Sequence, residues 1–163
     1  VEFKTNFLLV GTSNPCPCGM LYEGNCKCSN VEIERYTKKL SGPILDRIDL
    51  IVQIKRLNEE ELVNSKKGES SAEIRERVIK AREIQYKRFK EIRTNSTMTQ
   101  EELKKYCDIK DEDKRFLISA LENLKISARV YDKILKIART IADLEGKEEL
   151  ERKHLLEAIS FKK

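Results

Sequence analysis

The sequence predicts a mainly helical protein in which a short α/β part, residues 1–66, is followed by an all-α part, residues 67–163. Two observations support this prediction. Short, strongly apolar runs typical of buried strands occur in the first third of the chain, whereas the remainder repeats its apolar side chains at helical spacing. The composition also changes at the Lys-Lys-Gly-Glu sequence that begins at Lys66. A length of 163 residues is enough for one domain or for two small ones.

The α/β part is predicted to contain two strands and one helix. Residues 7–12 begin with an unbroken apolar run, as in a strand buried in a parallel sheet, and residues 49–54 are rich in β-forming side chains. Between them, Ser29 and Glu32 have the spacing of a capping box, so a helix is expected from there to about Leu40. A lone buried strand needs partners, and we therefore expect this sequence to be part of a longer protein.

The all-α part is predicted from capping signals and apolar stripes. Two further capping boxes begin at Ser70 and Thr99. The most regular apolar stripe follows Ser127 and stops before Gly146, a residue type that commonly ends helices. The predicted helices start near residue 58 and then span residues 70–93, 99–106, 111–123 and 127–145, with a last helix around residues 155–159.

Four of the five cysteines lie within one loop of the α/β part, at the spacing C-x-C-x7-C-x-C. Four thiolates that converge on one point suit a tetrahedral zinc ion, and Gly19 and Gly24 allow the loop to fold back tightly. No secretory signal is visible, so we expect a cytoplasmic protein in a reducing environment, where disulfides are the weaker alternative. The usual zinc pair is C-x2-C, so disulfides or free thiols stay open. The four cysteines are Cys16, Cys18, Cys26 and Cys28.

Composition narrows the range of partners without choosing one. Charged residues make up 37 % of the chain and the formal net charge is +5, a mildly basic balance that permits a nucleic-acid partner. No apolar run reaches the length of about 18 residues that indicates a membrane span. Residues 71–93 carry eight basic and four acidic side chains, which we interpret as a solvated helix face in preference to a DNA contact. His154 is expected at the surface and Cys107 in the core.

Three polar side chains stand where they could meet a ligand. Asn14 directly follows the first predicted strand, and ligands of open α/β sheets bind beyond the ends of strands; the alternative is an asparagine that forms a turn. Arg47 lies between Asp46 and Asp49 in an apolar stretch, where it either forms a structural ion pair or faces a phosphate. Arg129 lies in the first turn of a helix, where a cation opposes the helix dipole unless it meets an anion; a solvated arginine is the alternative.

Taken together, four segments of the chain resemble the magnesium-chelatase-like AAA+ ATPases, and among them the competence-associated branch-migration helicases of the ComM type. The segments occur in the family's order and cover nearly the whole chain. The resemblance implies that residues 1–66 are the late strands of an ATPase core and that residues 67–163 are its helical lid. The matching segments are residues 14–19, 40–50, 68–78 and 124–146.

The resemblance implies a role for each polar candidate. Asn14 corresponds to the sensor-1 residue that positions the attacking water, Arg47 to the arginine finger that reaches the neighbouring subunit's ATP, and Arg129 to the sensor-2 arginine of the lid. It also implies ATP, magnesium, a hexameric ring and a DNA partner for the full-length protein. No G-x-x-x-x-G-K-[ST] phosphate loop occurs in these 163 residues, so we expect this part alone to be inactive.

Three functions are therefore open at this stage. The first is a DNA motor, for which the Asn-Pro-Cys-Pro-Cys sequence that begins at Asn14 is the stronger match. The second is a magnesium-chelatase-type motor that inserts a metal into a porphyrin. The third is a non-catalytic interaction module stabilised by zinc, which a phosphate loop elsewhere in the full-length protein would exclude.

Overall fold

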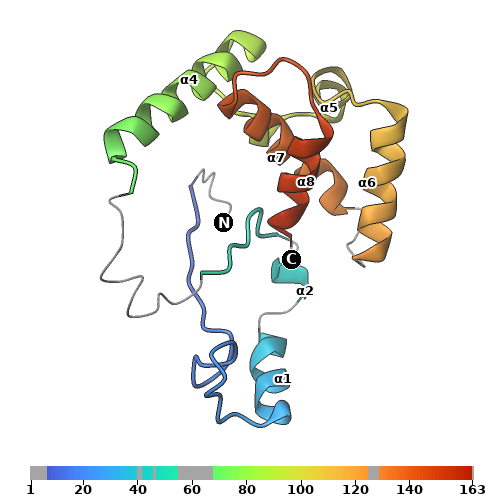
Figure 1. Ribbon diagram of the computed structural model, residues 1–163. Helices are drawn as coiled ribbons and strands as arrows, with labels where there is room; N and C mark the ends of the chain where they lie inside the picture. The colour runs from blue at the N-terminus through green and yellow to red at the C-terminus, as the bar shows by residue number, and fades with distance from the viewer. Residues whose placement is uncertain (1–6, 40–41, 46, 55–67, 125–128, 163) are drawn as a thin grey trace, which may run out of the picture. The chain divides into compact units, whose positions relative to one another are not determined.

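The structure is a computed structural model that describes residues 7–39, 42–45, 47–54, 68–124 and 129–162. It is mainly helical, and the chain divides into two compact units, Val1–Arg47 and Ile48–Lys163 (Figure 1). The domain boundary predicted at residue 66 lies outside the described residues and stays a prediction. None of the helices in the described ranges is both long and apolar enough to cross a membrane.

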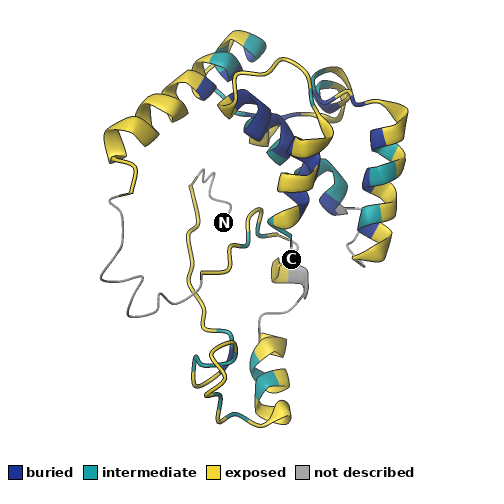
Figure 2. Cartoon of the chain, in the orientation of Figure 1, coloured by how far each residue is buried: buried dark blue, intermediate teal, exposed yellow. Residues whose placement is uncertain are grey.

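Neither predicted strand is present, because residues 7–12 and 49–54 have no strand structure. Most of their apolar residues are exposed, and Leu8 and Ile54 are both 89 % exposed (Figure 2). A strand requires a ladder of backbone hydrogen bonds to a neighbouring segment, and the described residues form no such ladder: Ile51 donates a single bond, to Phe161 O. The α/β part of the predicted fold is thus not seen, whereas the prediction of a mainly helical chain is confirmed.

The described residues of the first unit form two helices, α1 (Asn30–Lys39) and α2 (Gly42–Leu45). The capping box predicted before α1 is confirmed: the Ser29 N–H donates to Glu32 Oε2 at 2.8 Å, and the Glu32 N–H donates to Ser29 Oγ at 3.4 Å. The N–H and the hydroxyl of Ser29 both donate to the Glu32 carboxylate and lower its pKa because they stabilise the charged form. The α1 helix has no buried residue, so its local caps matter more than its packing.

The described part of the second unit is all-α, and the two capping boxes predicted within it are confirmed. The hydroxyls of Ser70 and Thr99 accept the N–H of the third helical residue, as the two capping boxes predict. The first of these helices ends at Phe89, earlier than predicted, because Lys90 takes a left-handed conformation with φ of 55°. The helix expected near residue 58 and the cap expected at Ser127 lie outside the described residues. The elements are α4 (Ser71–Phe89), η1 (Asn95–Thr97), α5 (Gln100–Tyr106), α6 (Asp111–Asn123), α7 (Arg129–Leu144) and α8 (Arg152–Ser160).

Helix α7 is the centre of this unit and packs against α4, η1, α5 and α8 (Figure 1). The predicted stop at Gly146 is confirmed: φ is 69°, its N–H donates to Asp143 O at 3.1 Å, and the Lys147 N–H donates to Ala142 O at 2.8 Å. This pair of bonds is the Schellman motif, which satisfies the last carbonyls of a helix. The stripe predicted for α7 is buried as well, with Tyr131 partly covered and the rest buried: Ile134, Leu135, Ala138, Ile141 and Ala142.

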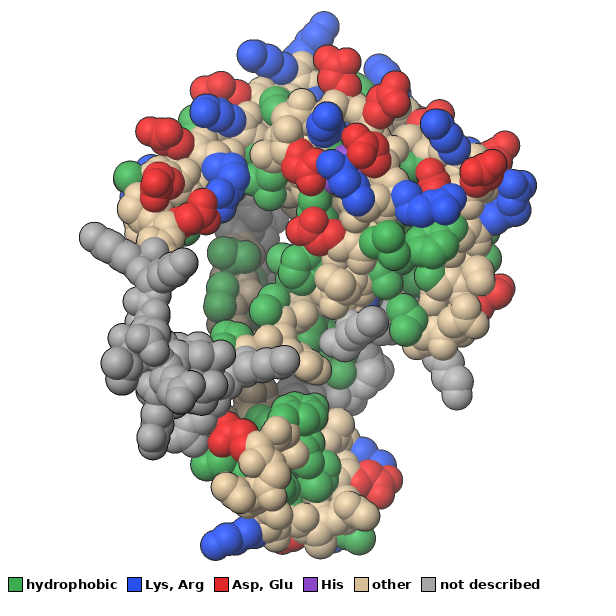
Figure 3. All heavy atoms as spheres, in the orientation of Figure 1, with side chains coloured by type: hydrophobic (Ala, Val, Ile, Leu, Met, Phe, Trp, Pro, Cys, Tyr) green, Lys and Arg blue, Asp and Glu red, His purple; other side chains and the backbone are tan. Residues whose placement is uncertain are grey.

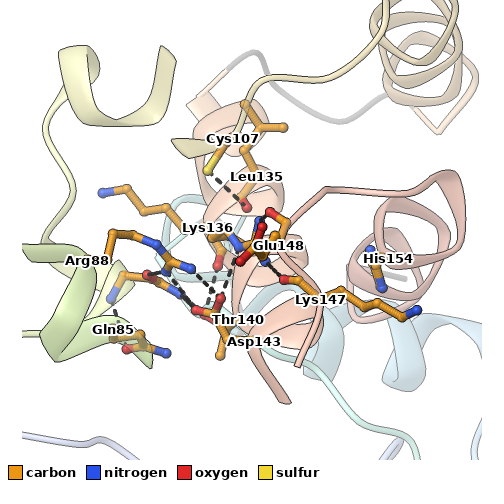
Figure 4. A network of polar contacts seen from close by, with 12 residues as sticks. Gln85, Arg88, Cys107, Leu135, Lys136, Thr140, Asp143, Lys147, Glu148 and His154 are labelled. Carbon is orange, nitrogen blue, oxygen red and sulfur yellow. Dashed lines mark hydrogen bonds and ion pairs between the residues drawn. The ribbon is translucent and has the colours of Figure 1, made fainter. Parts of the chain in front are cut away.

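A buried polar network, which the sequence analysis missed, fixes α7 to its neighbours (Figure 4). Its centre is the Asp143 carboxylate, which accepts from Arg88 of α4 at 2.8 and 2.5 Å and from Asn95 of η1 at 2.7 Å. Arg139 donates to the same carboxylate at 3.1 Å, and its other nitrogens donate to the carbonyls of Lys147 and Glu148. Burial lowers the pKa of Arg139, and the adjacent carboxylate opposes that change.

The surface prediction for His154 is wrong, because its side chain is completely buried. Its Nδ1 accepts the Glu151 N–H at 3.0 Å and so takes the place of a capping side chain, while Nε2 lies 3.2 Å from Glu145 Oε2. With Nδ1 as an acceptor, the proton of a neutral ring lies on Nε2 and points to that carboxylate. Cys107 is buried in the core, as predicted.

We expect Asp143→Ala to destabilise the protein strongly. The substitution leaves the guanidinium groups of Arg88 and Arg139 without their buried partner, and losing one member of a buried ion pair costs about 3–5 kcal/mol. The free energy of unfolding in urea measures this, with Asp111→Ala as the control because Asp111 is exposed. A loss no larger than that of the control would show that the network does not hold the unit together.

A second prediction concerns acid stability. Arg93 and the Thr99 N–H lower the pKa of Glu102 from 4.5 to about 2. Stability from this carboxylate is therefore complete above pH 4.5 and is lost as the pH falls towards 2. We expect Glu102→Gln to be less stable than the wild type at pH 7 and closer to it at pH 3, as measured by urea unfolding. Glu112→Gln controls for loss of an exposed carboxylate, and an equal deficit of Glu102→Gln at both pH values would contradict the prediction.

Candidate functional site

The four cysteines predicted to bind a metal are brought together by two tight turns before α1. Gly19 has φ of 79° and donates its N–H to Cys16 O at 3.0 Å, and Gly24 has φ of 74°. A side chain at either position would be strained by this left-handed backbone. The glycines that the sequence analysis singled out thus have the role expected of them, and they fold the two Cys-x-Cys pairs onto one another.

The sulfur atoms have the spacing of a tetrahedral metal centre. Cys16 Sγ lies 3.4 Å from Cys18 Sγ and 3.8 Å from Cys26 Sγ, Cys18 Sγ lies 3.7 Å from Cys26 Sγ, and all four sulfurs lie within 4.8 Å of one another. Metal–sulfur bonds of about 2.3 Å in a tetrahedron place the sulfurs about 3.8 Å apart. All four cysteines are free, and their sulfurs are too far apart for a disulfide, which needs about 2.05 Å.

The loop lowers the pKa of Cys18 and raises the pKa values of Cys26 and Cys28. Backbone N–H groups of Met20 and Lys27 stabilise the charged form of Cys18 and lower its pKa to about 6. The Cys18 backbone favours the thiolate of Cys28, but burial and the three neighbouring thiols outweigh it and raise the pKa of Cys28 to about 12. Four thiolates cannot share this space without a cation between them, and a bound metal deprotonates its thiol ligands. The residues present therefore fit a thiolate-binding metal ion such as zinc.

The three polar candidates are distributed over both units. Asn14 is exposed and lies beside Gly19 in the cysteine loop. Arg47 is exposed in a turn after α2, where its N–H donates to Ile44 O at 2.9 Å. Arg129 is the first residue of α7, the central helix of the second unit. The roles predicted for these three residues stay predictions.

Several contacts around these residues could not be read from local sequence patterns. Asp49, considered as a partner for Arg47, forms an ion pair with Lys133 of α7 at 2.8 Å. Arg88, counted within a basic helix face, instead pairs with Asp143. The sequence does contain a signal for the contact of Asp143. Arg139 and Asp143 lie on the side of α7 that carries the apolar stripe, and polar residues on a buried helix face need buried partners.

The distribution of charged side chains over the surface helps to interpret the basic helix of residues 71–93. On the face shown in Figure 3, Lys and Arg side chains alternate with Asp and Glu over the second unit. A surface that interleaves both signs lacks the continuous positive potential that phosphate backbones favour. This face therefore supports the interpretation of residues 71–93 as a solvated helix.

Comparison with known proteins identifies the family. The model for "Magnesium chelatase, subunit ChlI C-terminal" matches residues 68–162, and the model for "Magnesium chelatase, subunit ChlI" matches residues 1–62. The chain therefore belongs to the magnesium chelatase subunit ChlI family, as the resemblance predicted.

Individual relatives are longer than this chain. It is 40 % identical to "Competence protein ComM" of Haemophilus influenzae over 99 % of its own length and 32 % of the relative. It is 40 % identical to "Uncharacterized protein YifB" of Salmonella typhimurium and 34 % identical to "Uncharacterized protein Rv2897c" of Mycobacterium tuberculosis, with 99 % and 98 % of the chain covered. The chain spans 32 % of the length of each of these relatives.

We expect the chain to bind one zinc ion through its four clustered thiols. Cys26→Ser should abolish binding, whereas Cys107→Ser, which removes the thiol outside the cluster, should leave it intact. Elemental analysis after dialysis measures the stoichiometry, and Co²⁺ substitution tests for the absorption of a tetrahedral thiolate centre. Protein refolded with excess zinc that retains no metal would contradict this prediction.

Proposed function

We propose that this chain is the C-terminal part of an AAA+ ATPase motor that acts on DNA. The observation that carries the proposal is the 40 % identity to a competence protein along 99 % of the chain. The family membership supports the motor, and the competence relative supports the DNA partner. Because the relatives are about three times as long, the activity belongs to the full-length protein.

The exposed apolar segments support the predicted α/β core. Residues 7–10 are all exposed, although their side chains are Phe, Leu, Leu and Val. Exposed apolar runs of this kind mark surfaces that are covered in the complete assembly. In our proposal residues 7–12 and 49–54 are strands of a sheet whose neighbours belong to the full-length protein, and residues 67–163 form the lid.

The role proposed for each of the three polar residues follows from the chemistry of phosphoryl transfer. Asn14 orients the attacking water, Arg47 neutralises the developing charge on the neighbouring subunit's γ-phosphate, and Arg129 contacts the nucleotide of its own subunit. Magnesium and the phosphate loop of the full-length protein hold the nucleotide. Because an arginine supplied by a neighbour can contribute a factor of about 10³–10⁵ in rate, activity depends on assembly into a ring.

In this proposal the metal is zinc and its role is structural. The four thiolates of this short loop fill all four positions of a tetrahedral ion, so no position is open for a substrate. Binding would fix the loop that directly follows Asn14 and thereby hold that side chain in place.

The second candidate function is a motor for metal insertion, favoured by the names of both matching family models. Measurements of ATP hydrolysis by the full-length protein distinguish the DNA motor from the motor for metal insertion. ATP hydrolysis that rises with branched DNA and not with a porphyrin supports the DNA motor, and the opposite result supports the chelatase. A protein with no ATP hydrolysis under either condition would favour a non-catalytic module.

Arg47→Ala in the full-length protein should reduce ATP hydrolysis by about 10²-fold or more while ATP still binds. The reason is that the arginine acts on the neighbour's nucleotide during the reaction and does not hold its own. Steady-state hydrolysis measures the rate, and fluorescent-nucleotide titration measures the affinity.

Mixing experiments sharpen this prediction. Arg47→Ala subunits mixed with a phosphate-loop variant should recover activity, because each supplies what the other lacks at a shared interface. Arg129→Ala mixed in the same way should recover little. Undiminished turnover in Arg47→Ala would return this arginine to a structural role.

A further inference from the structure

The four clustered sulfurs of the first unit are not equally accessible to solvent. Cys16 is buried, Cys26 and Cys28 are half-buried, and Cys18 is exposed. Oxidation of cysteine is selective for thiolates that solvent can reach. An oxidant that approaches the cluster from solution therefore meets the sulfur of Cys18 first.

The exposed sulfur of Cys18 has two other cysteine sulfurs beside it. Cys18 Sγ lies 3.4 Å from Cys16 Sγ and 3.7 Å from Cys26 Sγ. A cysteine that is oxidised next to a second thiol forms a disulfide with it, whereas an isolated one does not. The fifth cysteine provides the contrast, because Cys107 is buried and its sulfur neighbour is the thioether of Met98 at 3.9 Å, which cannot form a disulfide.

A metal ion in this cluster would keep the exposed sulfur in its reactive form. Ligand cysteines bind as thiolates, and the thiolate is the form of cysteine that attacks an oxidant. The same four residues thus have two properties at once: their spacing fits a tetrahedral ion, and one of them presents a thiolate to solvent.

We propose that Cys18 is a modification site, at which a peroxide oxidises the sulfur and thereby opens the zinc site. The inference rests on the structural zinc of the proposed function. The Cys18 thiolate attacks one peroxide oxygen: an S–O bond forms, the O–O bond breaks, and hydroxide leaves. The thiolate of Cys16 or Cys26 then attacks the Cys18 sulfur, an S–S bond forms, and a second hydroxide leaves. Two thiolates lose two electrons, and hydrogen peroxide takes up two protons and becomes two waters.

The disulfide leaves two thiolates, which are too few for a tetrahedral structural site, so the ion is released. The first unit has little else to keep its loop in place. Cys16 is its one buried residue among those that the structure describes, and α1 has none. Oxidation therefore removes the order of the loop that holds Asn14 beside Gly19, and a thiol reductant with added zinc restores it.

The first test follows zinc and thiols together in the 163-residue chain. Hydrogen peroxide should release about one zinc ion per zinc-loaded chain, which a chromogenic chelator measures, and a thiol reductant should reverse the loss. Alkylation of the remaining thiols, followed by reduction and a second label, marks the two cysteines of the first disulfide in a peptide map. We expect Cys18 to be one of them and Cys107 to stay in its reduced form.

A pair of matched variants tests the role of Cys18 directly. Histidine replaces one thiolate in Cys₃His zinc sites, so Cys18→His and Cys28→His can each keep the ion. Release by peroxide should slow about 10-fold or more in Cys18→His and stay within about 3-fold of the wild type in Cys28→His, because the exposed thiolate is lost only in the first. Equal release rates in the two variants would overturn the inference. If either variant holds no zinc, the label map of the wild type decides.

The remaining outcomes separate this inference from the zinc site itself. A zinc-loaded chain that keeps its ion in peroxide, or a first disulfide that lacks Cys18, overturns the modification site and leaves the structural zinc standing. A chain that binds no zinc before oxidation overturns both.

Discussion

The helical unit depends on one buried carboxylate. Asp143 has no exposed surface on its side chain and receives hydrogen bonds from α4, from η1 and from its own helix. Arg139 extends the same network to the carbonyls that follow α7. Such a network adds little more stability than apolar packing of the same volume, but removing one of its members leaves a buried charge without a partner. The network joins α7 to α4 and η1. It therefore holds the helix that begins at Arg129 and carries Lys133, the partner of Asp49.

The first unit is organised in a different way. Among its described residues only Cys16 is buried, and α1 contributes none. A unit without an apolar core needs another source of order, and a metal ion bound by four thiolates is one that small modules use. The elements of the larger unit are thus held by polar contacts within an apolar core, whereas the smaller unit has clustered thiols that can bind a metal ion.

Prediction from sequence succeeded where the signal was local. Capping boxes at Ser29, Ser70 and Thr99, and the stop at Gly146, depend on residues within one or two turns and were confirmed. The clustering of the four cysteines was predicted in the same way. The strands failed because pairing requires a second segment. The surface prediction for His154 failed because its burial is set by tertiary packing. The roles of Asn14, Arg47 and Arg129 rest on family resemblance, since geometry within this chain does not test them.

The contrast between a buried network and an exposed ion pair gives the protein two responses to ionic strength. Dissolved ions do not reach Asp143, so the packing of the helices should change little with salt. They do reach Asp49, whose attraction to Lys133 is weakened by screening. Concentrated salt would then loosen the contact between Asp49 and helix α7 while the helices keep their arrangement.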